Sequence, residues 1–174
     1  MEQNVVDIKS LILRWGLYAG LAAVGFSVLV FVAGLTYSES KAVGFIVSAI
    51  NFALSILFIC LAIKSFKTAN EGYLSIGEAL KVGVGVALLA SIIGGIYQVV
   101  FVNYIDPNYA EKVMEVAMMQ NPDMTDAQLE LMEKIMYPSA WKIIGGSLFG
   151  GLFGGFIISL IAGAIMQHKR PMTF

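Results

Sequence analysis

Long apolar runs alternate with shorter polar segments along the chain, and four of these runs dominate it. They extend over about residues 15–37, 42–63, 82–102 and 143–166, and none contains Asp, Glu, Lys, Arg or His. A helix rises about 1.5 Å per residue, so each run is long enough to cross a hydrocarbon core about 30 Å thick. The pattern predicts an all-α integral membrane four-helix bundle that forms one membrane domain over residues 1–174.

The first apolar run differs from a secretory signal peptide. A signal peptide has an apolar stretch of roughly 7–15 residues followed by a small-residue cleavage site. Here the hydrophobicity continues through residues 28–32, and Glu2 and Asp7 precede the run. We therefore expect this segment to be retained as a membrane anchor.

The long connection at residues 103–142 is predicted to form an amphipathic helical hairpin outside the bilayer. Its first helix is expected over about 107–120, with Asp106 as N-cap and a proline at the first helical position. Its second helix is expected over about 126–137, ahead of Pro138. The hairpin is thus an insertion between the third and fourth spans.

The connection before the third span contains a helix start signal. Ser75 and Glu78 have the spacing of a capping box, in which the serine hydroxyl and the glutamate each bond the other residue's backbone amide. The third helix is therefore predicted to begin at Ile76, before the apolar run itself.

The positive charges predict how the chain is oriented. Cytoplasmic connections carry an excess of Lys and Arg. Seven of these residues lie at the two chain ends and in the second connection, and four lie in the first and third connections. The first group is Lys9, Arg14, Lys64, Lys67, Lys81, Lys169 and Arg170, and the second is Lys41, Lys112, Lys134 and Lys142. We expect both termini in the cytoplasm and the hairpin in the periplasm.

The composition agrees with a membrane protein and excludes several functions. The chain is 58% hydrophobic and only 13% charged, and its net charge of −1 gives no support to nucleic-acid binding. The one histidine, His168, lies next to Lys169 and Arg170 without a nucleophile or metal ligand at a suitable spacing. Cys60 lies within the second run, where it is most simply a small hydrophobic residue. No catalytic residue, metal site or cofactor is expected.

The fourth run contains a strip of small residues. Residues four apart share a helix face, and two adjoining rows here are almost free of side chains. One row is Gly146, Gly150 and Gly154, and the other is Ser147, Gly151, Gly155, Ser159 and Gly163. Such strips allow helix backbones to approach closely in lipid. The strip is interpreted either as packing within the bundle or as an interface with another copy or another membrane protein.

Few polar residues lie in the apolar runs. The side-chain amides are those of Asn51 in the second run and Gln98 in the third. Ser48 and Ser55 lie on either side of Asn51. Interhelical hydrogen bonds of this kind contribute only about 0.6 kcal/mol on average. The alternative is that they line a substrate path, although coupled transporters usually also have an ionisable residue at this depth.

Six methionines belong to the predicted hairpin. They are Met114, Met118, Met119, Met124, Met132 and Met136. Several converging thioethers would suit copper(I). Without an accompanying His or Cys, they are better interpreted as apolar stripes for packing of the two helices or contact with the membrane surface.

Three segments carry a resemblance to a known family. These are AIKSF at 62–66, GYLSIGEALKVG at 72–83, and NYIDP at 103–107 ahead of an acidic helical segment. The chain resembles the bacterial four-span membrane proteins known as domain of unknown function 4199, which are common in the Bacteroidetes. The resemblance covers nearly the whole chain and implies the fold and a bacterial inner membrane. It supplies no activity or catalytic residue.

These observations predict a non-catalytic accessory or assembly subunit of the inner membrane. The expected partners are the lipid bilayer and either another membrane protein or further copies of the chain, because the sequence offers much interaction surface and little chemistry. The alternative is a small oligomeric transporter or channel with Asn51 and Gln98 along its path.

Overall fold

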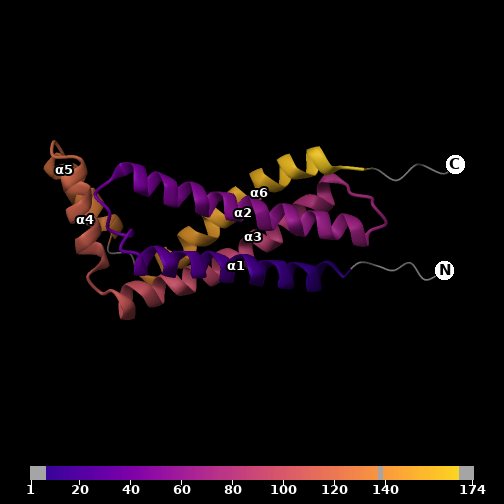
Figure 1. The fold of residues 1–174 in the computed structure, drawn as a ribbon, viewed down its shortest axis with the longest axis horizontal. Helices are drawn as coiled ribbons and strands as arrows, with labels where there is room; N and C mark the ends of the chain where they lie inside the picture. The colour runs from indigo at the N-terminus through magenta and orange to yellow at the C-terminus, as the bar shows by residue number, and fades with distance from the viewer. Residues whose placement is uncertain (1–6, 137–138, 169–174) are drawn as a thin grey trace.

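The computed structural model describes residues 7–136 and 139–168, and most of this part of the chain is helical (Figure 1). Tyr137 and Pro138, at the expected end of the hairpin, and Lys169 and Arg170, used to predict orientation, lie outside the described residues. The elements are α1 (Ile8–Val32), α2 (Lys41–Ala69), α3 (Ile76–Val100), the π-helix η1 (Phe101–Ile105), α4 (Tyr109–Gln120), α5 (Asp126–Met136) and α6 (Ala140–Met166).

Four of the helices are long and apolar enough to cross a membrane, namely α1, α2, α3 with η1, and α6. The prediction of an all-α membrane bundle is confirmed, and the protein is a multi-pass membrane protein. The bundle has two distinct ends (Figure 1). Helix α1 begins and α6 ends at one of them, the terminal end, whereas α4 and α5 lie across the other, the hairpin end.

Helix α1 is shifted toward the N-terminus relative to the apolar run that predicted it, since it begins at Ile8. It ends at Val32 rather than near Tyr37, because Gly34 adopts a left-handed conformation with φ of 70°. The amide of Gly34 donates to the carbonyl of Phe31 at 2.9 Å, and the amide of Leu35 donates to that of Val30 at 3.0 Å. These bonds close the helix as a glycine at this position commonly does.

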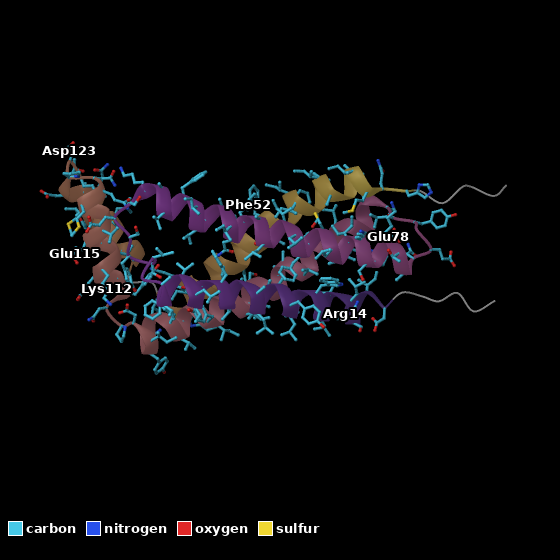
Figure 2. The ribbon with its side chains drawn as sticks, in the orientation of Figure 1. Arg14, Phe52, Glu78, Lys112, Glu115 and Asp123 are labelled. Carbon is cyan, nitrogen blue, oxygen red and sulfur yellow. The ribbon has the colours of Figure 1, made fainter. Side chains whose placement is uncertain are left out.

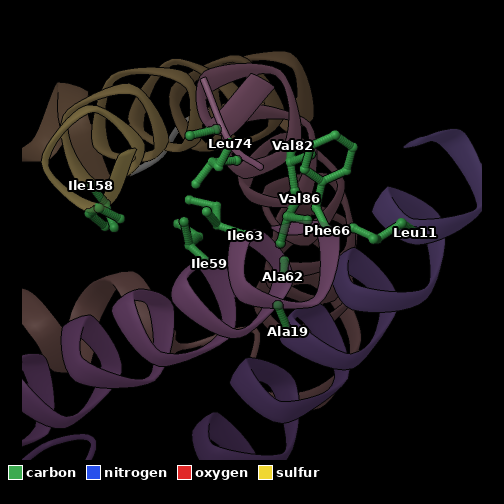
Figure 3. Packing of buried hydrophobic residues seen from close by; sticks show 12 residues of the cluster. Leu11, Ala19, Ile59, Ala62, Ile63, Phe66, Leu74, Val82, Val86 and Ile158 are labelled. Atoms are coloured by element: carbon green, nitrogen blue, oxygen red, sulfur yellow. The ribbon is translucent and has the colours of Figure 1, made fainter. Parts of the chain in front are cut away.

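The hydrophobic core lies toward the terminal end, because its members Leu11, Phe66 and Ala162 lie near the helix ends there. Figure 3 shows how its side chains pack together. Ile63 of α2, Val82 and Val86 of α3, and Leu74 in the turn between these helices are each completely buried. Leu74 also exchanges two backbone hydrogen bonds, of 2.8 and 2.9 Å, with His168 beyond α6. Backbone hydrogen bonds therefore join the turn between α2 and α3 to the segment after α6, next to the core.

The helical hairpin is attached to the turn between α1 and α2. Gln120 at the end of α4 donates its side-chain amide to the carbonyl of Glu39 at 3.0 Å. The Lys41 ammonium donates to the side-chain oxygen of Asn121 at 3.3 Å. Both connections that reach the hairpin end thus lie together, although they are far apart in the sequence.

The expected N-cap of the first hairpin helix is wrong. Helix α4 begins at Tyr109, two residues later than predicted, and its N-cap residue is Asn108. Asp106 instead closes η1, because its amide donates to the carbonyl of Phe101 at 2.8 Å. Its carboxylate bonds the Tyr37 hydroxyl and the Lys112 ammonium, and Asn108 rather than Asp106 is the N-cap residue of α4.

Candidate functional site

A cavity of about 490 Å³ lies between the four long helices, on the hairpin side of the core. It forms where α2 separates from α1 and α6, whereas the same helices are packed closely around Ile63 and Val86. Asn51 and Gln98, from α2 and α3, both line it. The structure thus brings together the two amides that the sequence singled out.

Four serines, one from each long helix, also line this cavity. Each hydroxyl donates to a backbone carbonyl of its own helix, at 2.8–3.1 Å. They are Ser27, Ser55, Ser91 and Ser147. Hydroxyl groups can back-bond in this way inside a helix without a partner helix, so these residues add polarity to the cavity at little cost.

The cavity wall carries no ionisable group of the usual catalytic kinds. Among the described residues that line it there is no Asp, Glu, Lys, Arg, His or Cys. In Figure 2, the labelled charged residues of the hairpin, Lys112, Glu115 and Asp123, lie at one end of the molecule, and Glu78 lies toward the other. The cavity is therefore a neutral space within the apolar part of the bundle.

A second cavity of about 140 Å³ continues from the first toward the hairpin end. Asn51 and Gln98 line both, while Phe101 and Tyr109 line only the second. The two aromatic rings meet edge to face with centroids 5.7 Å apart. Burial raises the pKa of Tyr109, and a hydrogen bond with Gln98 opposes this shift. These rings form part of the wall of the smaller cavity, toward the hairpin end.

A buried carboxylate lies immediately beyond these rings. Asp106 is only 6% exposed, and it accepts hydrogen bonds from the Tyr37 hydroxyl at 2.6 Å and from Lys112 Nζ at 2.7 and 2.9 Å. The Lys112 ammonium and the Tyr37 hydroxyl hold the pKa of Asp106 below its ordinary value. Burial, and then the bond to Asp106, raises the pKa of Tyr37. The carboxylate is therefore the charged member of this cluster.

Sequence reasoning did not find this Tyr37–Asp106–Lys112 cluster. Tyr37 precedes Asp106 by 69 residues, and no local pattern links them. The one signal was the spacing of Asp106 and Lys112 across a turn that contains Pro107. The position of the cluster next to η1 could not be predicted from the sequence, although π-helical turns occur often at functional sites.

One row of the small-residue strip of α6 packs against α3. A methyl group placed on Gly155 would lie 2.5 Å from the Ala87 Cβ, and one on Gly151 would lie 2.5 Å from the Ser91 Oγ. The pairing repeats at every fourth residue along the two antiparallel helices. The pairs are Ser147 with Gly95, Gly151 with Ser91, Gly155 with Ala87, Ser159 with Gly83, and Gly163 with Ala79.

The other row of the strip faces open space in the described part of the chain. A methyl group placed on Gly146, Gly150 or Gly154 would meet nothing within 4 Å. Gly150 and Gly154 line the larger cavity, whereas Gly146 lies outside it. The two rows thus have different environments, which the sequence alone did not separate.

The remaining singled-out residues lie away from the cavities. Ser75 and Glu78 form both bonds of a capping box at the start of α3, at 3.2 and 2.8 Å. Cys60 is half-buried beside the core. The His168 ring stacks on Tyr73 with centroids 5.6 Å apart, at the terminal end.

The hairpin methionines whose side chains the structure describes differ in exposure. Met118 and Met119 on α4 are 43% and 51% exposed, whereas Met114 and Met132 are half-buried. Within the described residues, no group of three or more His, Cys, Asp or Glu side chains is placed to hold a metal ion.

Comparison with known proteins gives a family but no activity. No curated protein and no solved structure shows significant similarity to this chain. The family described as "Protein of unknown function (DUF4199)" matches residues 14–168, which confirms the expected resemblance. Because the match includes every described helix that could cross a membrane, the chain belongs to the DUF4199 family.

Proposed function

We propose that this protein is a non-catalytic accessory or assembly subunit of a bacterial inner membrane that binds another membrane protein through α6. The observation that carries the proposal is the open row of Gly146, Gly150 and Gly154. These glycines leave an accessible groove along one side of α6, while the neighbouring row is filled by α3.

In lipid, such a groove stabilises association mainly by allowing the backbone of a second helix to approach closely. Lipid tails are as apolar as the helices, so association depends on dispersion contacts and on weak hydrogen bonds between backbones. Phe149 and Phe153 form a ridge beside the groove, where they are 71% and 61% exposed and their rings stack at 6.4 Å. A partner helix with small residues could approach α6 along the groove and also contact this ridge.

The hairpin supplies a second surface with a different character. Residues 103–142 contain seven acidic residues and three lysines, a net charge of −4. Charge complementarity favours correct pairing and faster association more than it adds affinity. We therefore expect the partner to have a basic surface on the side of the membrane where the hairpin lies.

The distribution of Lys and Arg supports an orientation with both chain ends in the cytoplasm. Lys64, Lys67 and Lys81 lie at the terminal end in or near the turn between α2 and α3, and the hairpin lies at the opposite end (Figure 1). Short basic connections are retained in the cytoplasm. The acidic hairpin is then periplasmic.

The groove is tested by the double variant Gly150→Leu and Gly154→Leu. A Cβ at either position meets nothing within 4 Å, so the variant should fold and yet bind its partner at least tenfold more weakly. Affinity purification from native membranes in mild detergent measures the co-purified partner. The matched control is Gly25→Leu with Gly44→Leu, two unobstructed positions on α1 and α2. A wild-type protein that repeatedly purifies alone, or a groove variant that retains its partner, contradicts the proposal.

The cavity supports a second candidate function, a small oligomeric transporter or channel. Its specific support is that Asn51 and Gln98 line both connected cavities. Flux in reconstituted liposomes that is lost in the Asn51→Leu variant would favour this candidate. Flux equal to that of empty liposomes would leave the accessory role as the better account.

A further inference from the structure

The larger cavity presents more hydrogen-bond acceptors than donors. The hydroxyl hydrogens of its four serines already bond backbone carbonyls of their own helices. Their oxygens keep free lone pairs, because a hydroxyl has one donor and two acceptor positions. A molecule that enters this space therefore finds acceptors on all four helices.

Two polar groups that line the cavity, the Asn51 amide and the Tyr97 hydroxyl, have no hydrogen-bond partner among the described residues. Asn51 is half-buried at the middle of the apolar run of α2. The amide of Gln98, by contrast, bonds Tyr109. An amide that faces an apolar environment without a hydrogen-bond partner is costly in proportion to its burial. A bound headgroup that hydrogen-bonds Asn51 would remove this cost.

The size and the opening of the cavity indicate an amphiphile from the bilayer. Its volume of about 490 Å³ falls within the roughly 300–1,000 Å³ that is usual for small-molecule sites. Three residues that line it are exposed, namely Phe52, at 59%, and Ser55 on α2, and Gly150 on α6. The cavity therefore opens sideways between membrane-spanning helices, where an acyl chain can extend into the lipid.

From these observations we infer that the cavity binds a neutral lipid with a hydroxyl headgroup. The headgroup hydroxyls donate to the serine oxygens and to the side-chain oxygen of Asn51, and they accept from the side-chain nitrogen of Asn51. An anionic phospholipid headgroup finds no cation among the described residues that line the cavity. A lipid headgroup with acceptors only would leave most of the acceptors unused. The inference goes beyond the proposed partner interaction. Gly150 and Gly154 also line the cavity, so lipid binding is tested on the chain alone, without a partner helix in the groove.

The experiment uses the full chain in lipid nanodiscs and a 1-monoacylglycerol probe that carries a diazirine in its acyl chain. We expect labelling of residues that line the cavity, and we expect unlabelled monoolein to compete. Methyl oleate, which lacks a donor, dioleoyl phosphatidic acid, which is anionic, and glycerol, which has no tail, should not compete at the same concentration. Competition by glycerol would show that a water-soluble polyol is recognised and would overturn the lipid assignment.

Variants separate the role of Asn51 from general packing. Asn51→Leu should lower labelling about tenfold, the loss expected for about one hydrogen bond in a buried site. Asn51→Gln should restore part of it. Ser48→Ala, one turn away and outside the cavity lining, is the matched control and should label like wild type. Ser55→Phe, which fills the cavity, should abolish labelling independently. Unchanged labelling of Asn51→Leu, or equal competition by methyl oleate and monoolein, would overturn the inference.

Discussion

At the scale of single residues, Asp106 shows how a tertiary contact can replace a local one. Its sequence context, with a proline next in the chain, is typical of a helix N-cap. In the structure Tyr37 and Lys112 bond its carboxylate, and α4 starts at Tyr109 without it. Sequence reasoning identified the residue as important but gave it the wrong partners, because Tyr37 belongs to a distant connection.

Replacement of this carboxylate should destabilise the hairpin end. Asp106→Asn removes the charge that Lys112 and Tyr37 bond, and it should lower the free energy of unfolding by about 1–3 kcal/mol. The measurement is unfolding in mixed detergent micelles. The matched control is Glu130→Gln, which breaks an ion pair with Lys134 whose side chains are about two-thirds exposed, and should change stability by less than about 0.5 kcal/mol. Equal effects of the two substitutions would contradict the assigned role of Asp106.

The same carboxylate predicts a dependence on pH. Because the pKa of Asp106 is lower in the folded protein, its contribution is complete above the ordinary value near 3.8 and is lost as the pH falls through the lower folded value. Wild type should therefore lose more stability than Asp106→Asn when the pH is lowered from about 6 to below about 4. Unfolding curves at several pH values test this, and parallel losses in the two proteins would exclude Asp106 as the source.

At the scale of elements, α6 has two adjoining rows of small residues with different surroundings. The periodicity of the sequence identified both rows, but it could not tell which one faces α3. That distinction depends on how α6 is rotated about its axis, and the contacts of Ala87 with Gly155 and of Ser91 with Gly151 define it. The structure shows packing within the bundle for one row, whereas an interface with another protein remains a proposal for the other.

The two rows should respond differently to the same substitution. Gly155→Leu places a side chain against Ala87 and the backbone of Val84, so it should destabilise the bundle by about 1–3 kcal/mol or more. A Cβ placed on the adjacent residue, Gly154, would meet nothing within 4 Å. Gly154→Leu should therefore leave the stability nearly unchanged. Thermal unfolding in detergent compares them. Similar melting temperatures for the two variants would show that the rotation of α6 is wrong.

At the scale of the whole molecule, the bundle is closed at its terminal end and open toward the hairpin. The apolar runs predicted the four spanning helices, since each run is long and free of charge. They did not predict the cavity around Asn51, because a cavity depends on where helices separate and not on the composition of any one helix. The large residues Ile63 and Leu74 fill the terminal end, whereas Ser55 and Gly150 leave space nearer the hairpin.

This arrangement requires the hairpin and the turn between α2 and α3 to lie on opposite sides of one membrane. The measurement that tests it most directly is labelling of single cysteines, introduced as Met119→Cys in the hairpin or Glu71→Cys in the turn, in a Cys60→Ala background. A membrane-impermeant maleimide should reach position 119 from the periplasmic side of intact spheroplasts, and position 71 only after permeabilisation. Labelling of both positions from the same side would contradict the four-span account.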